Sequence, residues 1–171
     1  MKPQAPVPGA AIELRTFRQA DATQVNKVAL AAFEQYRDLY GNWPAMAASV
    51  SSMSALAASG DITVAERAGK IVGAVAYVPA GWPKASFFDA SWPVLRMLVV
   101  DPAARGGGIG RALTLACLER ARRDGAAMIA LHTSPIMQVA LAMYLRLGFE
   151  RLHDAPPIHG VPYAVYVKRL A

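Results

Sequence analysis

The eleven residues DPAARGGGIGR, from Asp101 to Arg111, decide the fold of this chain. They join an almost continuous apolar segment, Val94 to Val100, to an amphipathic segment that Gly125 closes, which predicts a buried strand followed by a helix. Four glycines in five positions remove side chains where the backbone must approach another group closely. Free N–H groups at a helix start bind anions, and Arg105 and Arg111 add positive charge on either side. The alternative is a packing turn, for which one glycine would suffice.

The glycine pattern excludes two common nucleotide loops. A Walker loop needs a lysine followed by Ser or Thr, and this stretch contains no lysine. A dinucleotide fingerprint needs a third glycine at its sixth position, but the two possible frames place Arg111 or Leu113 there. The anion bound by this loop is therefore held in another way.

Strand-like and helix-like segments alternate on both sides of this loop, which predicts one layered α/β or α+β domain. We expect Asp21 to cap the first helix and Pro135 to lie in the first turn of the last one. A long loop, residues 79–93, contains Trp82, Phe87, Phe88 and Trp92, which would cover either an acceptor pocket or the core. Strands are expected at 12–17, 62–66, 71–78, 94–100, 126–132, 149–152 and 161–168, and helices at 20–40, 43–59, 108–124 and 135–147.

Composition limits the protein class. The chain has 171 residues, of which 54% are hydrophobic and 18% charged, so a disordered protein is excluded and a single domain is expected. Residues 1–10 contain three prolines and read as a loose tail before a domain at 11–171. No apolar run approaches the length of a membrane span. The net charge of +6 favours an acidic partner such as a phosphorylated cofactor, a nucleic acid or a membrane surface.

Cysteine usage points to a reducing compartment. Cys117 is the single cysteine, so neither an intrachain disulfide nor a zinc site with two or more cysteines can form. We therefore expect a cytoplasmic protein without a metal, with a catalytic thiol as the lesser alternative.

A second motif follows the glycine loop. The segment Leu131–Pro135 ends the next expected strand, and Ala140, Tyr144 and Gly148-Phe149 follow at fixed spacing. Together with Arg105-x-x-Gly108-x-Gly110, this pattern resembles the GNAT acyltransferases, over about a third of the chain. The resemblance implies one mixed sheet of about seven strands flanked by about four helices. It also implies that the strand before the glycine loop bulges and splays from the strand after the glycine-rich helix.

The resemblance further implies acetyl-CoA or coenzyme A as cosubstrate, with no metal. Backbone groups of Leu98, Val99 and Val100 would pair with the pantetheine arm, and one N–H there would polarise the thioester carbonyl. N–H groups of the loop would hold the pyrophosphate. The cofactor-binding residues would be Leu98, Val99, Val100, Arg105, Gly106, Gly107, Gly108, Ile109, Gly110, Arg111 and Ser134.

The implied reaction is direct attack of a primary amine on the thioester. Tyr144 stands at the position of the general acid in the family. A phenol suits this role because it can protonate the departing thiolate. The alternative is a tyrosine that packs in the core. Met137 replaces an asparagine that often contacts the cofactor, so this contact is lost or comes from Ser134 or Thr133.

The usual glutamate base is also missing, because Val94-Leu95-Arg96 contains no carboxylate. Water could take the proton, or a group from elsewhere could act as base or contact the acceptor. The candidates are His132, Glu34, Asp38, Asp89 and Arg96. His132 could equally be structural, and Arg96 needs an anion, either an internal carboxylate or that of a substrate.

Three functions compete. The first is an N-acetyltransferase acting on a small molecule or a peptide. The second is a non-catalytic acyl-CoA-binding or regulatory domain of the same fold. The third, a nucleic-acid-binding protein, rests on charge alone, since no stacking motif or lysine-rich arm accompanies it. We expect neither a nucleic acid nor a membrane as partner, and a homodimer stays open.

Overall fold

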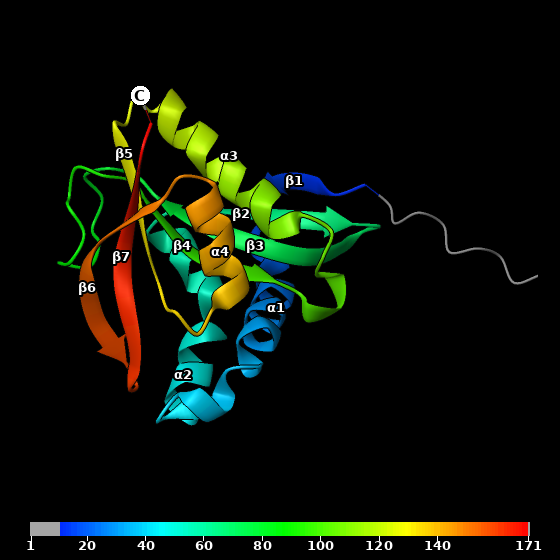
Figure 1. The fold of residues 1–171 in the computed structure, drawn as a ribbon. Helices are drawn as coiled ribbons and strands as arrows, with labels where there is room; N and C mark the ends of the chain where they lie inside the picture. Colours follow the sequence, from blue (N-terminus) through cyan, green and yellow to red (C-terminus); the bar gives the residue numbers. More distant parts are fainter. Residues whose placement is uncertain (1–10, 171) are drawn as a thin grey trace, which may run out of the picture.

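A seven-stranded mixed sheet forms the middle layer of the computed structural model, which describes residues 11–170 (Figure 1). The expected tail at 1–10 lies outside these residues. The strands follow the order β1-β2-β3-β4-β5-β7-β6, and among the described strands only β4 and β5 are parallel neighbours. The strands are β1 (Glu13–Thr16), β2 (Asp61–Arg67), β3 (Lys70–Val78), β4 (Val94–Val100), β5 (Met128–Thr133), β6 (Glu150–Ile158) and β7 (Val161–Arg169).

Helices cover both faces of the sheet. Successive strand residues point to opposite faces, so Val94 belongs to the same buried cluster as Val28 of α1 (Ala22–Glu34), whereas Leu95 belongs to the cluster of Leu113 of α3 (Ile109–Arg123). Figure 1 shows α3 and α4 on one side and α1 and α2 on the other. The α-helices are α1 (Ala22–Glu34), α2 (Trp43–Val50), α3 (Ile109–Arg123) and α4 (Gln138–Arg146). The predicted single domain of about seven strands and about four helices is confirmed. No helix within residues 11–170 is long and apolar enough to cross a membrane.

The first two helices end earlier than expected. After α1 the chain makes a 3-10 turn at Arg37–Leu39, because the Tyr40 hydroxyl turns inward to the Tyr163 hydroxyl, 2.5 Å away. After α2, the Ser52 hydroxyl donates to the carbonyl of Ala48 (2.9 Å), and a separate 3-10 segment follows at Met53–Ala58. Serine hydroxyls that bond to nearby carbonyls compete with continued helix in this way.

The last helix and strand also differ in length. The N–H of Met137 donates to the carbonyl of Ser134 (3.0 Å), so Pro135 lies in a turn and α4 begins three residues after it. Strand β6 extends to Ile158, well past the expected end at 152. It is an edge strand, where prolines are tolerated, and its register with β7 shifts between Ala155 and Ile158.

A bulge interrupts β4 just before the glycine loop. Arg96 pairs with Ala76 and Val99 pairs with Ala74, so Met97 and Leu98 together face Val75 of β3. Met97 has φ +52°, which the sequence did not signal. Pairing between β4 and β5 is limited to Val94 and Ala130, so the two strands diverge beyond this point. The bulge and the splay implied by the resemblance are confirmed.

Asp21 anchors β1 to the start of α1 rather than capping the helix. Its carboxylate accepts hydrogen bonds from the Arg15 guanidinium (2.8 and 2.9 Å) and from the Arg18 N–H (2.8 Å), and none from α1. The residue is 5% exposed. The hydrogen bonds from Arg15 are the main reason that the pKa of Asp21 falls from 3.8 to about 2.

We expect Asp21→Asn to lower the free energy of unfolding by about 1–2 kcal/mol at pH 7, because Arg15 loses a partner. A lowered pKa stabilises the fold above pH 3.8, and this contribution is lost as pH falls toward 2. The variant should therefore lose less stability than the parent between pH 4 and pH 2. Urea unfolding at several pH values measures both effects. Asp154→Asn, in an exposed pair with Arg151, is the control and should change nothing measurable.

Candidate functional site

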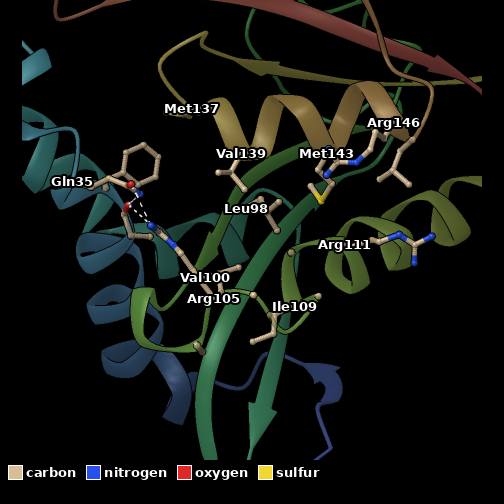
Figure 2. A pocket seen from close by; sticks show the side chains of 18 of the residues that line it. Gln35, Leu98, Val100, Arg105, Ile109, Arg111, Met137, Val139, Met143 and Arg146 are labelled. Carbon is tan, nitrogen blue, oxygen red and sulfur yellow. Dashed lines mark hydrogen bonds between the residues drawn. The ribbon is translucent and has the colours of Figure 1, made fainter. Parts of the chain in front are cut away.

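A cavity of about 460 Å³ lies between β4, the glycine loop, α4 and the end of α1 (Figure 2). Leu98 and Val100 form its β4 wall, and Val139 and Met143 extend from α4 toward it (Figure 2). Since β4 no longer pairs with β5 here, the cavity adjoins a strand with a free edge. The lining consists of Ala32, Phe33, Gln35, Tyr36, Leu98, Val100, Ala104, Arg105, Gly106, Gly108, Ile109, Gly110, Arg111, Met137, Val139, Ala140, Met143, Arg146 and Leu147.

The glycine loop presents open backbone to this cavity. Gly106 and Gly108 have φ of 86° and 76°, and a Cβ at either would meet nothing within 4 Å. Gly108 is the N-cap of α3 and supplies no side chain to bond the first N–H groups of the helix. A Cβ at Gly110 would lie 3.7 Å from the Val100 side chain and 3.8 Å from that of Leu98. Unbonded N–H groups at a helix start and a side-chain-free approach suit an anion such as a diphosphate.

Arginines give the cavity a positive lining. Arg105 donates to Gln35 Oε1 (3.2 Å) and to the Ala32 carbonyl (3.5 Å), so it also ties the loop to α1 (Figure 2). Arg111 and Arg146 line the cavity as well, and no carboxylate of residues 11–170 does. Arg146 lies outside both motifs, but its spacing from Met143 and Val139 on α4 places the three on one helix face.

Several predicted cofactor contacts lie beside the cavity rather than on its wall. The Val99 side chain is 1% exposed and packs in the core. A Cβ at Gly107 would face Arg67. Ser134 is fully buried, and its hydroxyl accepts the Ile136 N–H (3.3 Å). Met137 does line the cavity, so a thioether stands where an amide is common in the resemblance. Backbone contacts from Val99 and Gly107 stay predictions.

Tyr144 lies behind the cavity. It is 4% exposed, packs edge-on against Phe149 with ring centroids 5.7 Å apart, and is absent from the lining. Burial raises the pKa of its phenol, so the hydroxyl stays protonated. Its role as proton donor stays a prediction. Tyr36 does line the cavity, and burial raises its pKa too. Tyr36 belongs to no motif, so it could not be selected from the sequence.

The position of Cys117 does not support a catalytic thiol. Cys117 is 3% exposed in the core and does not line the cavity. Burial raises the pKa of its thiol to about 12, so the reactive thiolate is absent near neutral pH. A cytoplasmic location, expected from the single cysteine, stays a prediction.

None of the candidate bases lines the cavity. Glu34, Asp38 and Asp89 are exposed, and the Asp89 carboxylate accepts hydrogen bonds from the Ser91 N–H and hydroxyl. Burial, with the positive charge of Arg96 as a smaller cause, lowers the pKa of His132 to about 4, so its ring is neutral at neutral pH. Within residues 11–170, no group of three or more metal-ligating side chains is gathered at one place.

Arg96 lies on β4 as expected, and of the two anions considered for it, the internal carboxylate is absent from residues 11–170. Among residues 11–170, no acid lies within 4.0 Å of its guanidinium and no hydrogen bond holds it. The side chain is half-buried, and this burial lowers its pKa. Its strand neighbours supply no acid because the adjacent positions are apolar.

Curated relatives match parts of the chain. A mycothiol acetyltransferase from Amycolatopsis mediterranei is 52% identical over 61 residues, which cover 36% of this chain and 20% of that protein. N-acetyltransferase 8F1 from Rattus norvegicus is 36% identical over 98 residues, 57% of this chain and 43% of that protein. The chain thus spans less than half of the length of either relative.

Solved structures match almost the whole fold. A GNAT family acetyltransferase from Brucella melitensis in complex with acetyl-CoA is 28% identical, with a TM-score of 0.61 over 90% of this chain and 95% of that chain. The PaiA N-acetyltransferase from Thermoplasma acidophilum in complex with coenzyme A is 17% identical, with a TM-score of 0.73 over 93% and 99%. The family model for the acetyltransferase (GNAT) family matches residues 25–149, a span that contains the glycine loop, the bulged strand and all of the cavity lining, and the chain belongs to this family.

Proposed function

We propose that this protein is an N-acetyltransferase that moves an acetyl group from acetyl-CoA to a primary amine. The observation that carries the proposal is the cavity itself, which joins the unbonded N–H groups at the start of α3 to the free edge of β4 beyond its bulge. An anion site and an unpaired strand edge in one cavity suit a ligand that carries a diphosphate and an amide-containing arm.

Different residues of the cavity would bind different parts of acetyl-CoA. N–H groups of residues 106–111 hold the diphosphate, with Arg111 and Arg146 supplying positive charge at the cavity. The edge of β4 at residues 98–100 pairs with the pantetheine amides. Val139 is 84% exposed, and with Met143 it offers apolar surface to the arm. The lining therefore fits the proposed ligand along its length.

Bound acetyl-CoA supplies an electrophilic thioester carbonyl. A backbone N–H of β4 just after the bulge donates to the carbonyl oxygen and stabilises the charge that develops when the amine attacks. A C–N bond forms, the C–S bond breaks, and the hydroxyl of Tyr144 gives its proton to the departing thiolate. Among residues 11–170 no carboxylate lines the cavity, and burial lowers the pKa of His132 to about 4, which makes its ring a weak base, so the proton of the attacking amine leaves through water.

Two measurements test this function. Titration calorimetry with coenzyme A measures binding, and a thiol assay with acetyl-CoA and a panel of amines, aminoglycosides, amino acids and peptides measures turnover. We expect binding, and thiol release matched by an acetylated product in mass spectrometry. Binding without turnover of any amine would favour a non-catalytic acyl-CoA-binding domain, which Met137 and the lack of a carboxylate in the lining support. Absence of binding would overturn both functions.

A further inference from the structure

Arg96 and His132 stand on the two diverging strands, on the same face of the sheet. The last pair between β4 and β5 is Val94 with Ala130, and both of these residues face the α1 side. Two residues further along each strand, side chains return to that face, which places Arg96 on β4 and His132 on β5 where the two strands diverge. The positive charge of Arg96 contributes to the lowered pKa of His132, as expected for neighbouring groups.

The guanidinium of Arg96 differs from two other partly buried guanidinium groups. Arg15 is held by Asp21 and Glu66, and Arg120 is held by Asp61 and Asp124. Within residues 11–170, Arg96 has neither a hydrogen bond nor an acid. A half-buried charge without a partner costs free energy, and an anion from outside would offset this cost.

The surroundings of His132 are aromatic. Its ring centroid lies 5.3 Å from that of Phe87, 5.6 Å from Phe88 and 5.2 Å from Tyr163. Its Nδ1 is buried and has no hydrogen-bond partner within the described residues. Aromatic walls lower the local dielectric, which strengthens the attraction between a guanidinium and an anion.

Arg96 lies close, along β4, to the backbone that we assign to the reacting thioester. Arg96 directly precedes the bulge of Met97 and Leu98. We assign a backbone N–H just after this bulge to the thioester carbonyl oxygen. Neighbouring strand residues are about 3.3 Å apart. An anion held by Arg96 would therefore lie next to the stretch of β4 that we assign to the thioester. A carboxylate matches the planar guanidinium with two parallel hydrogen bonds.

We propose that the acceptor is an amino acid with an apolar or aromatic side chain, whose carboxylate binds Arg96 while its side chain contacts Phe87, Phe88 and His132. This inference rests on the proposed acetyltransferase function and names its substrate class. It explains why this arginine, in the middle of an apolar strand, has no internal acid.

Matched acceptors test the proposal. L-phenylalanine and L-phenylalaninamide share the amine and the ring, but the amide lacks the carboxylate. The wild type should have a kcat/KM about 10- to 100-fold higher for the acid than for the amide, most of it in KM. Arg96→Gln should reduce this ratio to near 1, and Arg96→Lys should keep part of it. Arg123→Gln removes an exposed charge at the end of α3 and should leave the ratio unchanged. Equal wild-type rates for acid and amide, or an unchanged ratio in Arg96→Gln, would overturn the proposal.

A binding experiment separates this proposal from the proposed function. N-acetyl-L-phenylalanine, the expected product, is titrated into the protein saturated with coenzyme A and followed by NMR line broadening. Wild-type protein should bind it at least about 10-fold more tightly than Arg96→Gln, while both bind coenzyme A equally and unfold at similar temperatures. Equal affinity for the product overturns the carboxylate assignment even if no amine is turned over. Failure of coenzyme A binding overturns the proposed function instead.

Discussion

Gly110→Asp is expected to weaken coenzyme A binding by at least about 100-fold. A Cβ at this position points to the Val100 and Leu98 side chains and lies 4.0 Å from the Met143 sulfur, so a carboxylate there enters the cavity. It would face the diphosphate at the start of α3, and like charges brought together in a binding site cost several kcal/mol. Titration calorimetry measures the loss, and circular dichroism verifies the fold.

Gly110→Ala provides the matched control. The same Cβ makes only ordinary contacts of 3.7–4.0 Å, and alanine favours helix over glycine. We expect coenzyme A affinity within about threefold of the parent and slightly higher thermal stability. If the aspartate variant bound coenzyme A as tightly as the alanine variant, the diphosphate would lie elsewhere.

Tyr144→Phe is expected to lower kcat by about tenfold to 10⁴-fold while the affinity for acetyl-CoA stays unchanged. The reason is loss of the proton for the departing thiolate, since burial keeps this phenol protonated at neutral pH. Single-turnover measurements at saturating substrate isolate the chemical step. The substitution retains the ring that packs on Phe149, so the core should remain intact.

Tyr36→Phe is the paired variant, because Tyr36 lines the cavity whereas Tyr144 does not. We expect it to keep kcat within a few-fold of the parent. A large loss of kcat in Tyr36→Phe, with none in Tyr144→Phe, would assign proton donation to Tyr36 and return Tyr144 to the core.

Local signals in the sequence predicted the glycine loop and the strand before it. The glycines are adjacent and the strand is apolar, so each pattern can be read without knowledge of distant contacts. The family resemblance supplied what local pattern could not, namely the splay of β4 from β5. It carried the motif positions, including Tyr144, but it gave no information on which side chains reach the cavity wall.

The missed features depend on contacts between distant segments. Apolar spacing as far as Tyr36, followed by Gly41, predicts a helix to residue 40, whereas in the fold α1 ends at Glu34 and Tyr40 turns inward to Tyr163. The sequence leaves open whether Arg96 meets an internal acid or the carboxylate of a substrate, because the neighbours of a strand residue on other elements cannot be read from its own strand. Arg146 belongs to no motif and lines the cavity because it shares a face of α4 with Val139 and Met143.

The single pair that joins β4 to β5 gives the sheet an edge in its interior. This edge lies between the fourth and fifth strands of the sheet order rather than at either side of the sheet. A ligand that pairs with β4 acts as a missing strand and binds only the folded chain, so it raises the melting temperature in proportion to the logarithm of its concentration. The Val100 amide, which alternation along β4 turns away from β3, should then exchange with solvent quickly in the free protein and slowly in the bound one. The resistance of this protein to unfolding in a cell would thus follow the supply of its acyl donor.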